Sequence, residues 1–129
     1  SAGEGAGMTA TSFRVLAEVP EFVGPDGARI LELAGRSTGL ASHSLAIISH
    51  PPGMTTRKHH HTVADEVYYV QSGTGRIAVG EEVHVVGAGD IITIRPGQPH
   101  KVWADGAEDL VLIVTCAPAY EEPEVAWDE

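Results

Sequence analysis

Short runs rich in β-branched and aliphatic residues recur along this chain, and glycine or proline interrupts them at nearly every boundary. The runs follow one another at intervals of roughly 8 to 12 residues, the usual spacing of strands in sandwiches and barrels. They read FRVLAEV, ARILELA, SLAIIS, EVYYVQ, RIAV, EVHVV, DIITI, HKVWA and DLVLIVT. No stretch carries an uninterrupted helical period. The pattern therefore predicts an all-β sandwich or barrel.

The length of the chain limits how many such units it holds. It has 129 residues, of which 43% are hydrophobic, enough for one core but not for two domains. We expect a single domain over residues 12–118. Residues 1–11, which begin SAGEGAG, are expected to be a flexible leader or an expression scar. Residues 119–129 are expected to be a solvated acidic tail, with attachment to the body through Trp127 as the alternative.

The charge balance excludes several classes of partner. Lys and Arg number 8 against 18 Asp and Glu, a formal net charge of −10, and the cations are scattered. Such a chain repels phosphate, so we expect no nucleic acid and no anionic membrane as partner. No apolar run reaches the roughly 20 residues of a membrane span and no signal sequence is evident, so we expect a cytoplasmic protein. The single cysteine, Cys116, cannot form an internal disulfide and is interpreted as a small core residue.

Three consecutive histidines form the most informative segment. In an extended strand His59 and His61 point to one side and His60 to the other. Glu66 follows His61 by five residues and can join the same face only if the chain bends between them. We expect Thr62–Asp65 to form a hairpin turn there. Beyond it, Glu66, Tyr68 and Val70 share one face of the next strand.

A second segment ends on His100, which the preceding Pro-Gly-Gln-Pro turn places at the start of a strand. Three imidazoles and one carboxylate from separate strands form a mixed nitrogen and oxygen site. Such a site suits one divalent transition metal, Fe, Mn, Ni or Zn. Four protein ligands leave open positions for substrate or water, as in catalytic metal sites.

These residues give the chain its resemblance to the cupin family. Its first motif, G-x5-H-x-H-x4-E-x6-G, is matched at every fixed position, and the glycines and histidine of its second motif, G-x5-P-x-G-x2-H-x3-N, are matched as well. The matching residues are Gly53, His59, His61, Glu66, Gly73, Gly89, Gly97 and His100. Two positions depart: Arg95 stands where the family has proline, and Ala104 where it has asparagine.

The resemblance spans residues 12–118. It implies an all-β, cupin-type double-stranded β-helix, or jelly-roll barrel, that binds a metal through His59, His61, Glu66 and His100.

Three further residues are candidates for the cavity, each with a structural alternative. Tyr68 is a candidate catalytic residue or a core tyrosine. Arg76 is a candidate substrate clamp, since resembling proteins often aim a side chain of this strand into the barrel, or a solvated strand residue. Arg95 either lines the cavity mouth or orients the turn before His100. His60, by strand parity, faces away from the site, at a dimer contact or behind the ligands.

We therefore expect a metal-dependent enzyme that acts on a small organic substrate in the barrel. Three histidines and a glutamate with free positions suit Fe(II), which favours a non-haem dioxygenase. An isomerase, a lyase or a polyketide cyclase is the alternative within the same class, and a non-catalytic small-ligand-binding cupin is the alternative outside it. A homodimer is expected, since single-domain cupins commonly pair through an edge strand.

Overall fold

The computed structural model describes residues 12–129, and within them the chain is built from strands and three single-turn 3₁₀ helices. The expected leader, residues 1–11, lies outside the described residues. The helices are η1 (Leu16–Glu18), η2 (Arg36–Thr38) and η3 (Glu122–Glu124). The strands are β1 (Glu21–Val23), β2 (Arg29–Ala34), β3 (Ser44–His50), β4 (His59–His61), β5 (Asp65–Ser72), β6 (Gly75–Val79), β7 (Glu82–Val86), β8 (Ile91–Ile94), β9 (His100–Ala104), β10 (Leu110–Ala117) and β11 (Val125–Trp127). The all-β prediction is confirmed.

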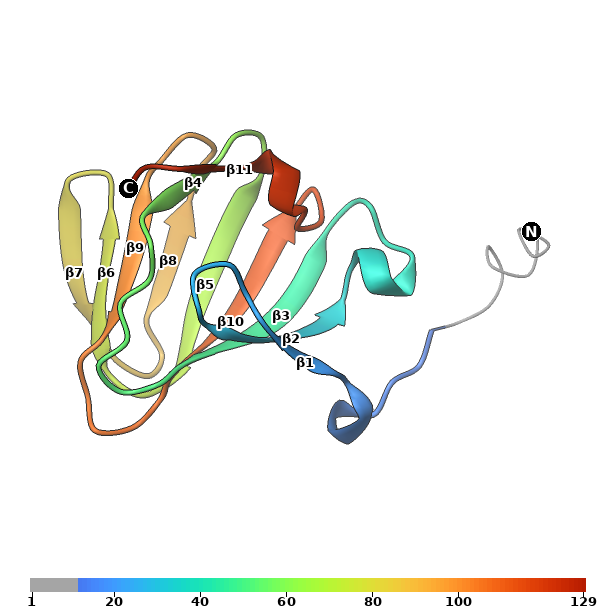
Figure 1. Ribbon diagram of the computed structural model, residues 1–129, viewed down its shortest axis with the longest axis horizontal. Coiled ribbons are helices and arrows are strands. Elements are labelled where there is room, and N and C mark those ends of the chain that lie inside the picture. Colours follow the sequence, from blue (N-terminus) through green and yellow to red (C-terminus); the bar gives the residue numbers. More distant parts are fainter. Residues whose placement is uncertain (1–11) are drawn as a thin grey trace.

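The strands form two antiparallel sheets that face one another (Figure 1). One sheet has the order β1-β2-β3-β10-β5-β8 and the other β11-β4-β9-β6-β7. Some neighbours in each sheet are distant in sequence: β10 pairs with both β3 and β5, and β4 pairs with both β9 and β11. This crossing between sheets brings the two histidine segments and Glu66 to one place.

The interior of the barrel follows from the two-residue alternation of the strands. On β10 the buried residues are Leu110, Leu112, Val114 and Cys116, and their neighbours in the chain are more exposed. On β5, Glu66, Tyr68 and Val70 are buried, as their shared face predicts. Apolar residues from both sheets, including Ile77, Ile94 and Val102, pack into one core.

The structure corrects the expected hairpin at Thr62–Asp65. β4 and β5 lie in different sheets, so this segment carries the chain from one layer to the other. The residues of this segment indicate a bend between β4 and β5, but they do not reveal whether the two strands pair with one another after it.

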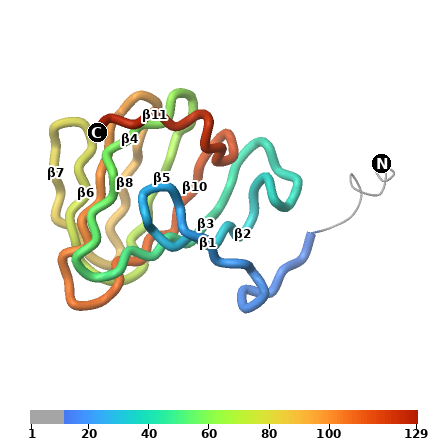
Figure 2. The backbone as a smooth tube through the Cα atoms, in the orientation of Figure 1, coloured from blue at the N-terminus to red at the C-terminus, as the bar shows by residue number. Residues whose placement is uncertain are grey.

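The C-terminal segment is likewise not a solvated tail. β11 pairs with β4 along all three residues, with Trp127 opposite His59 and Val125 opposite His61. Figure 2 shows the C-terminal end of the chain running beside β4. The many carboxylates of this segment favour a solvated tail, but composition does not reveal that the segment pairs with β4.

Within residues 12–129, no helix is long and apolar enough to cross a membrane.

Candidate metal centre

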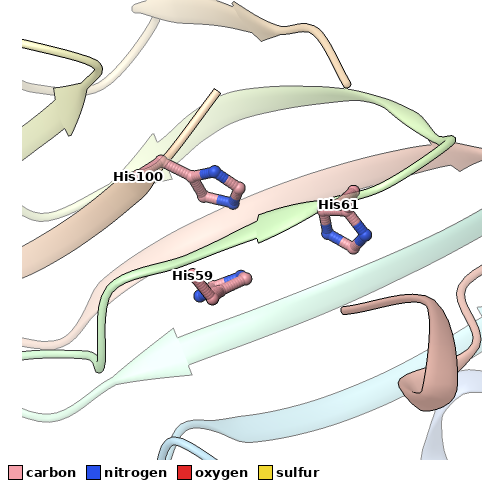
Figure 3. A group of neighbouring side chains, drawn as sticks. All are labelled: His59, His61 and His100. Atoms are coloured by element: carbon pink, nitrogen blue, oxygen red, sulfur yellow. The ribbon is translucent and has the colours of Figure 1, made fainter. Parts of the chain in front are cut away.

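Two neighbouring strands bring three histidines together. His59 and His61 lie on β4, and His59 pairs directly with His100 at the start of β9. One ring nitrogen from each histidine lies within 4.8 Å of the others (Figure 3). The ring centroids of His59 and His100 are 4.3 Å apart, and His61 lies 5.8 Å from each of them. The cluster is formed as strand parity predicts.

Glu66 reaches this cluster from the opposite sheet. Its Oε1 lies 3.1 Å from His100 Nε2 and 3.4 Å from His61 Nε2. The carboxylate is buried, with a 6% exposed side chain, as are both imidazoles. The structure thus brings together all four residues that the sequence predicts as metal ligands.

In each of the three histidines, Nδ1 contacts an oxygen outside the cluster, and this contact leaves Nε2 to face the cluster. His59 Nδ1 lies 3.0 Å from the Arg57 carbonyl oxygen, and His100 Nδ1 lies 3.0 Å from the Gln98 carbonyl oxygen. His61 Nδ1 lies 2.7 Å from Glu124 Oε2. Because these oxygens only accept hydrogen bonds, each Nδ1 carries the hydrogen and each neutral ring presents its Nε2 lone pair. This is the arrangement in which metal-ligating histidines are held.

The buried atoms at the centre match a cation. Glu66 Oε1 and His100 Nε2 are both buried and neither forms a hydrogen bond, although they lie 3.1 Å apart. Two facing lone pairs without a donor are unfavourable in a dry interior. A divalent metal held by both atoms, together with His59 and His61, would satisfy them. The three-nitrogen, one-oxygen donor set fits Fe, Mn, Ni or Zn.

Burial and neighbouring charges both shift the pKa values of the residues in the cluster. Burial alone raises the pKa of Glu66, but its contacts with His100 and His61 lower it to about 2. Burial alone lowers the pKa of His61, but Glu66 and then Glu124 raise it to about 9, so without a metal this ring also holds a proton at Nε2 at neutral pH, which a bound metal would displace. The pKa of His59 is lowered by burial and by the neighbouring His100. Glu66 is therefore a carboxylate at neutral pH, ready to bind a cation.

A cavity opens from this cluster between the two sheets. Apolar side chains from β2, β3, β9 and β10 form most of its wall, and aromatic residues line it as well. They include Phe22, Ile30, Ile48, Val102, Leu112, Val114, Tyr120 and Trp127. The charged lining residues are the carboxylates Asp26, Glu32 and Glu66, and among the described residues no lysine or arginine lines it. The wall is apolar and its charge is negative.

Tyr68 lies on this cavity, next to the histidines. Its ring is buried and its centroid lies 5.9 Å from that of His100, in an edge-to-face arrangement. Burial, followed by the charge of Glu66, raises the pKa of the phenol well above its ordinary value. Tyr68 is therefore a neutral hydrogen-bond donor at the site.

The two predicted substrate-binding arginines are not part of the cavity wall. Arg76 lies on the outer face of β6, where its Nε is 2.7 Å from Asp105 Oδ2 and its guanidinium covers the Trp103 ring at 4.8 Å. Arg95 is 69% exposed and lies 2.8 Å from Asp65 Oδ1. The structure corrects the expectation for Arg76, because its parity on β6 is opposite to that of the buried Ile77. His60 also faces away from the site and lies 2.8 Å from Asp128.

Two residues near the cluster were not assigned to the site from the sequence. Cys116 is buried opposite Glu66 on β10, and its Sγ lies within 4.8 Å of the ligand atoms of His61 and Glu66. Burial and then the charge of Glu66 raise the pKa of its thiol to about 12. Glu124, in the segment expected to be solvated, contacts His61. The alternation of LVLIVTC marks Cys116 as inward-facing, but no local signal marks Glu124.

The comparisons with known proteins identify the fold family. Residues 46–116 match the family described as the cupin domain. The chain belongs to the cupin family. This cupin is 31% identical to the uncharacterized protein MJ1618 of Methanocaldococcus jannaschii over 104 residues, which cover 80% of this chain and 83% of that protein. The cupin resemblance and the double-stranded β-helix prediction are confirmed.

Solved structures of the same fold include two enzymes from Streptomyces. The nucleoside dehydratase Pac13 superposes with a TM-score of 0.75 at 20% identity, over 92% of this chain and 91% of that one. The polyketide cyclase RemF of Streptomyces resistomycificus superposes with a TM-score of 0.78 at 20% identity, over 93% of this chain and 87% of that one. At this identity the likeness establishes the fold alone.

Proposed function

We propose that this cupin is a metal-dependent enzyme acting on a small, uncharged and largely apolar molecule in the barrel cavity. The observation that carries the proposal is the cluster of three histidines, each held by a contact at Nδ1, together with the buried and unpaired Oε1 of Glu66. This oxygen lies 3.1 Å from His100 Nε2 and 3.4 Å from His61 Nε2. His59, His61, Glu66 and His100 hold one divalent transition metal. A metal there supplies a Lewis acid that polarises a substrate oxygen.

The chain's own residues suit proton transfer to or from such a substrate. Tyr68 is a neutral phenol that lines the cavity beside His100, so it can donate a hydrogen bond or a proton to a polarised group. The surrounding apolar wall excludes water and strengthens these interactions. We therefore favour an elimination, isomerisation or cyclisation. The dehydratase and cyclase activities of Pac13 and RemF are compatible with this choice.

The charge of the cavity defines the substrate class. Asp26 and Glu32 lie on the wall with no lysine or arginine among the described lining residues, so an anionic group away from the metal finds repulsion and no partner. An uncharged cyclic substrate with one oxygen for the metal is not repelled by these carboxylates and needs no cationic partner.

Metal content tests the proposal directly. We expect the purified protein to carry about one transition metal per chain by elemental analysis, because the four ligand atoms form one site. The variant His100→Ala loses a fully buried ligand and should hold less than about a tenth of that amount. His84→Ala, which removes a 52% exposed histidine on β7, is the matched control and should keep its metal. Equal metal contents in the two variants contradict the proposal.

Two probes of similar shape test the substrate class, and oxygen uptake tests the reaction class. We expect 2-naphthol to raise the melting temperature of the metal-loaded protein more than 2-naphthoate does. A larger effect of 2-naphthoate contradicts the proposal that the substrate is uncharged.

The non-haem dioxygenase expected from the ligand set stays a prediction. Oxygen consumption by the Fe(II)-loaded protein with any of a panel of thiols, catechols, diketones and flavonoids supports it over proton-transfer chemistry.

A further inference from the structure

Glu124 lies behind the metal centre, in η3 immediately before β11. Its side chain is only 12% exposed, although the segment is acidic and near the C-terminal end. Oε2 lies 2.7 Å from His61 Nδ1, while Oε1 accepts hydrogen bonds from the backbone N–H groups of Val63 at 2.7 Å and Ala64 at 2.8 Å. One carboxylate thus holds both a metal ligand and the loop that follows it.

The residues around Glu124 hold the rest of β4 in the same way. We call residues 122–129 the C-terminal strap. β4 pairs with β9 only through His59 and His100, whereas β11 in the strap pairs with all three of its residues. The Trp127 ring lies 5.3 Å from that of His59, and the Arg57 guanidinium lies 4.4 Å from the same indole. The strap therefore supplies most of the contacts that fix the orientation of this short strand.

The chemistry of the contact sets the state of His61. A carboxylate oxygen only accepts, so Nδ1 of His61 must carry a hydrogen and a neutral ring must present its Nε2 lone pair toward Glu66. We propose that Glu124 is a positioning residue of the metal centre, which fixes the tautomer and the ring orientation of His61, and that the C-terminal strap is part of the site. The inference rests on the proposed metal-dependent function.

A glutamine at this position separates the two contacts of Glu124. Its amide oxygen still accepts from Val63 and Ala64, and a flip of the amide is disfavoured because it would aim two donors at those N–H groups. The NH₂ group then faces His61 Nδ1 and donates to it, which moves the ring hydrogen to Nε2 and blocks the lone pair that a metal needs. The substitution changes the tautomer while keeping the loop anchored.

The experiment compares Glu124→Gln with Glu122→Gln, which changes an exposed carboxylate of the same short helix. Zn²⁺ affinity is measured by competition with a chelator, and the visible spectrum is recorded with Co²⁺. We expect Glu124→Gln to bind Zn²⁺ about 10- to 100-fold more weakly and to alter the Co²⁺ spectrum at saturation. Glu122→Gln should match the wild type in both. Similar melting temperatures in EDTA for the two variants separate loss of positioning from loss of fold.

The outcomes distinguish this inference from the proposed function. If the wild type and Glu122→Gln bind no metal, the proposed function fails. If they bind metal and Glu124→Gln binds it equally with the same Co²⁺ spectrum, only the role of Glu124 is overturned. A long-range ¹H–¹⁵N correlation on the Zn²⁺-loaded wild type tests the inference without any variant: His61 should be protonated at Nδ1 and coordinated through Nε2, and the reverse overturns it.

Discussion

Substituting alanine for Gly73 tests the close packing that places β5 against β10. Gly73 has φ of +86°, and a Cβ built on it lies 2.2 Å from the Asp109 carbonyl oxygen and 2.8 Å from Leu110 Cα. Both contacts are with backbone, so no side-chain rotation relieves them. Gly89 is the matched control, because its φ of +93° is similar but a Cβ there meets nothing within 4 Å. The two variants share the backbone strain and differ in the clash.

The two geometries give different magnitudes. A non-glycine residue in the left-handed region loses about 1–2 kcal/mol, which is the whole effect expected for Gly89→Ala. In Gly73→Ala the loss of stability also includes the cost of displacing the β10 backbone beside Leu110, which is fully buried. Overpacking of this kind costs about 1–3 kcal/mol more. For a chain of this size about 1 kcal/mol corresponds to a melting-temperature change of roughly 4 °C. We expect losses of about 4–8 °C for Gly89→Ala and about 8–20 °C for Gly73→Ala.

Thermal unfolding followed by circular dichroism measures both variants. EDTA is present throughout, so that differences in bound metal do not contribute to the melting temperature. Equal melting temperatures for the two variants refute the reasoning, because they show that the approach of the Asp109 backbone adds nothing to the strain of a positive φ.

Three further predictions concern the site and the outer surface. Because burial, with Glu66, raises the pKa of Cys116 to about 12, its thiolate forms only as the pH rises toward that value. Iodoacetamide at pH 8 should therefore modify Cys116 in urea but not in the native protein, as seen by mass spectrometry; rapid native labelling contradicts the burial. Arg76→Ala should leave the urea midpoint and Zn²⁺ affinity unchanged, because its pair with Asp105 is exposed to screening solvent; a weaker Zn²⁺ affinity would place Arg76 in the site after all. Zn²⁺ at 100 times its dissociation constant should stabilise the wild type by about 2.7 kcal/mol, or roughly 10 °C. His100→Ala should show no such shift, and an equal shift in both proteins argues against binding at this centre.

Strand alternation accounts for the part of the site that the sequence could predict. The period of two places His59 and His61 on one face and groups Glu66 with Tyr68, and the glycine and proline punctuation locates the bends between strands. These are local properties, set by neighbours in the chain. The same parity also places Cys116 inside, with Leu112 and Val114.

Pairing between distant segments accounts for what the sequence could not predict. Periodicity does not reveal that β4 and β5 enter different sheets or that Arg76 faces outward, because parity alone does not say which face of a strand meets the core. Glu124 gives no local signal, since its burial arises only when β11 pairs with a strand more than sixty residues earlier in the chain.

The sequence by itself determined an all-β chain, the cupin motifs and the three histidines that form one cluster, with Glu66 beside two of them. Only the tertiary structure decided that the cavity wall is apolar and negative, that the predicted arginines lie outside it, and that the C-terminal strap contacts His59 and His61 from behind. The physical reason is that alternation and turn chemistry act over a few residues. The orientation of an imidazole depends on a hydrogen-bond partner that folding brings from the far end of the chain.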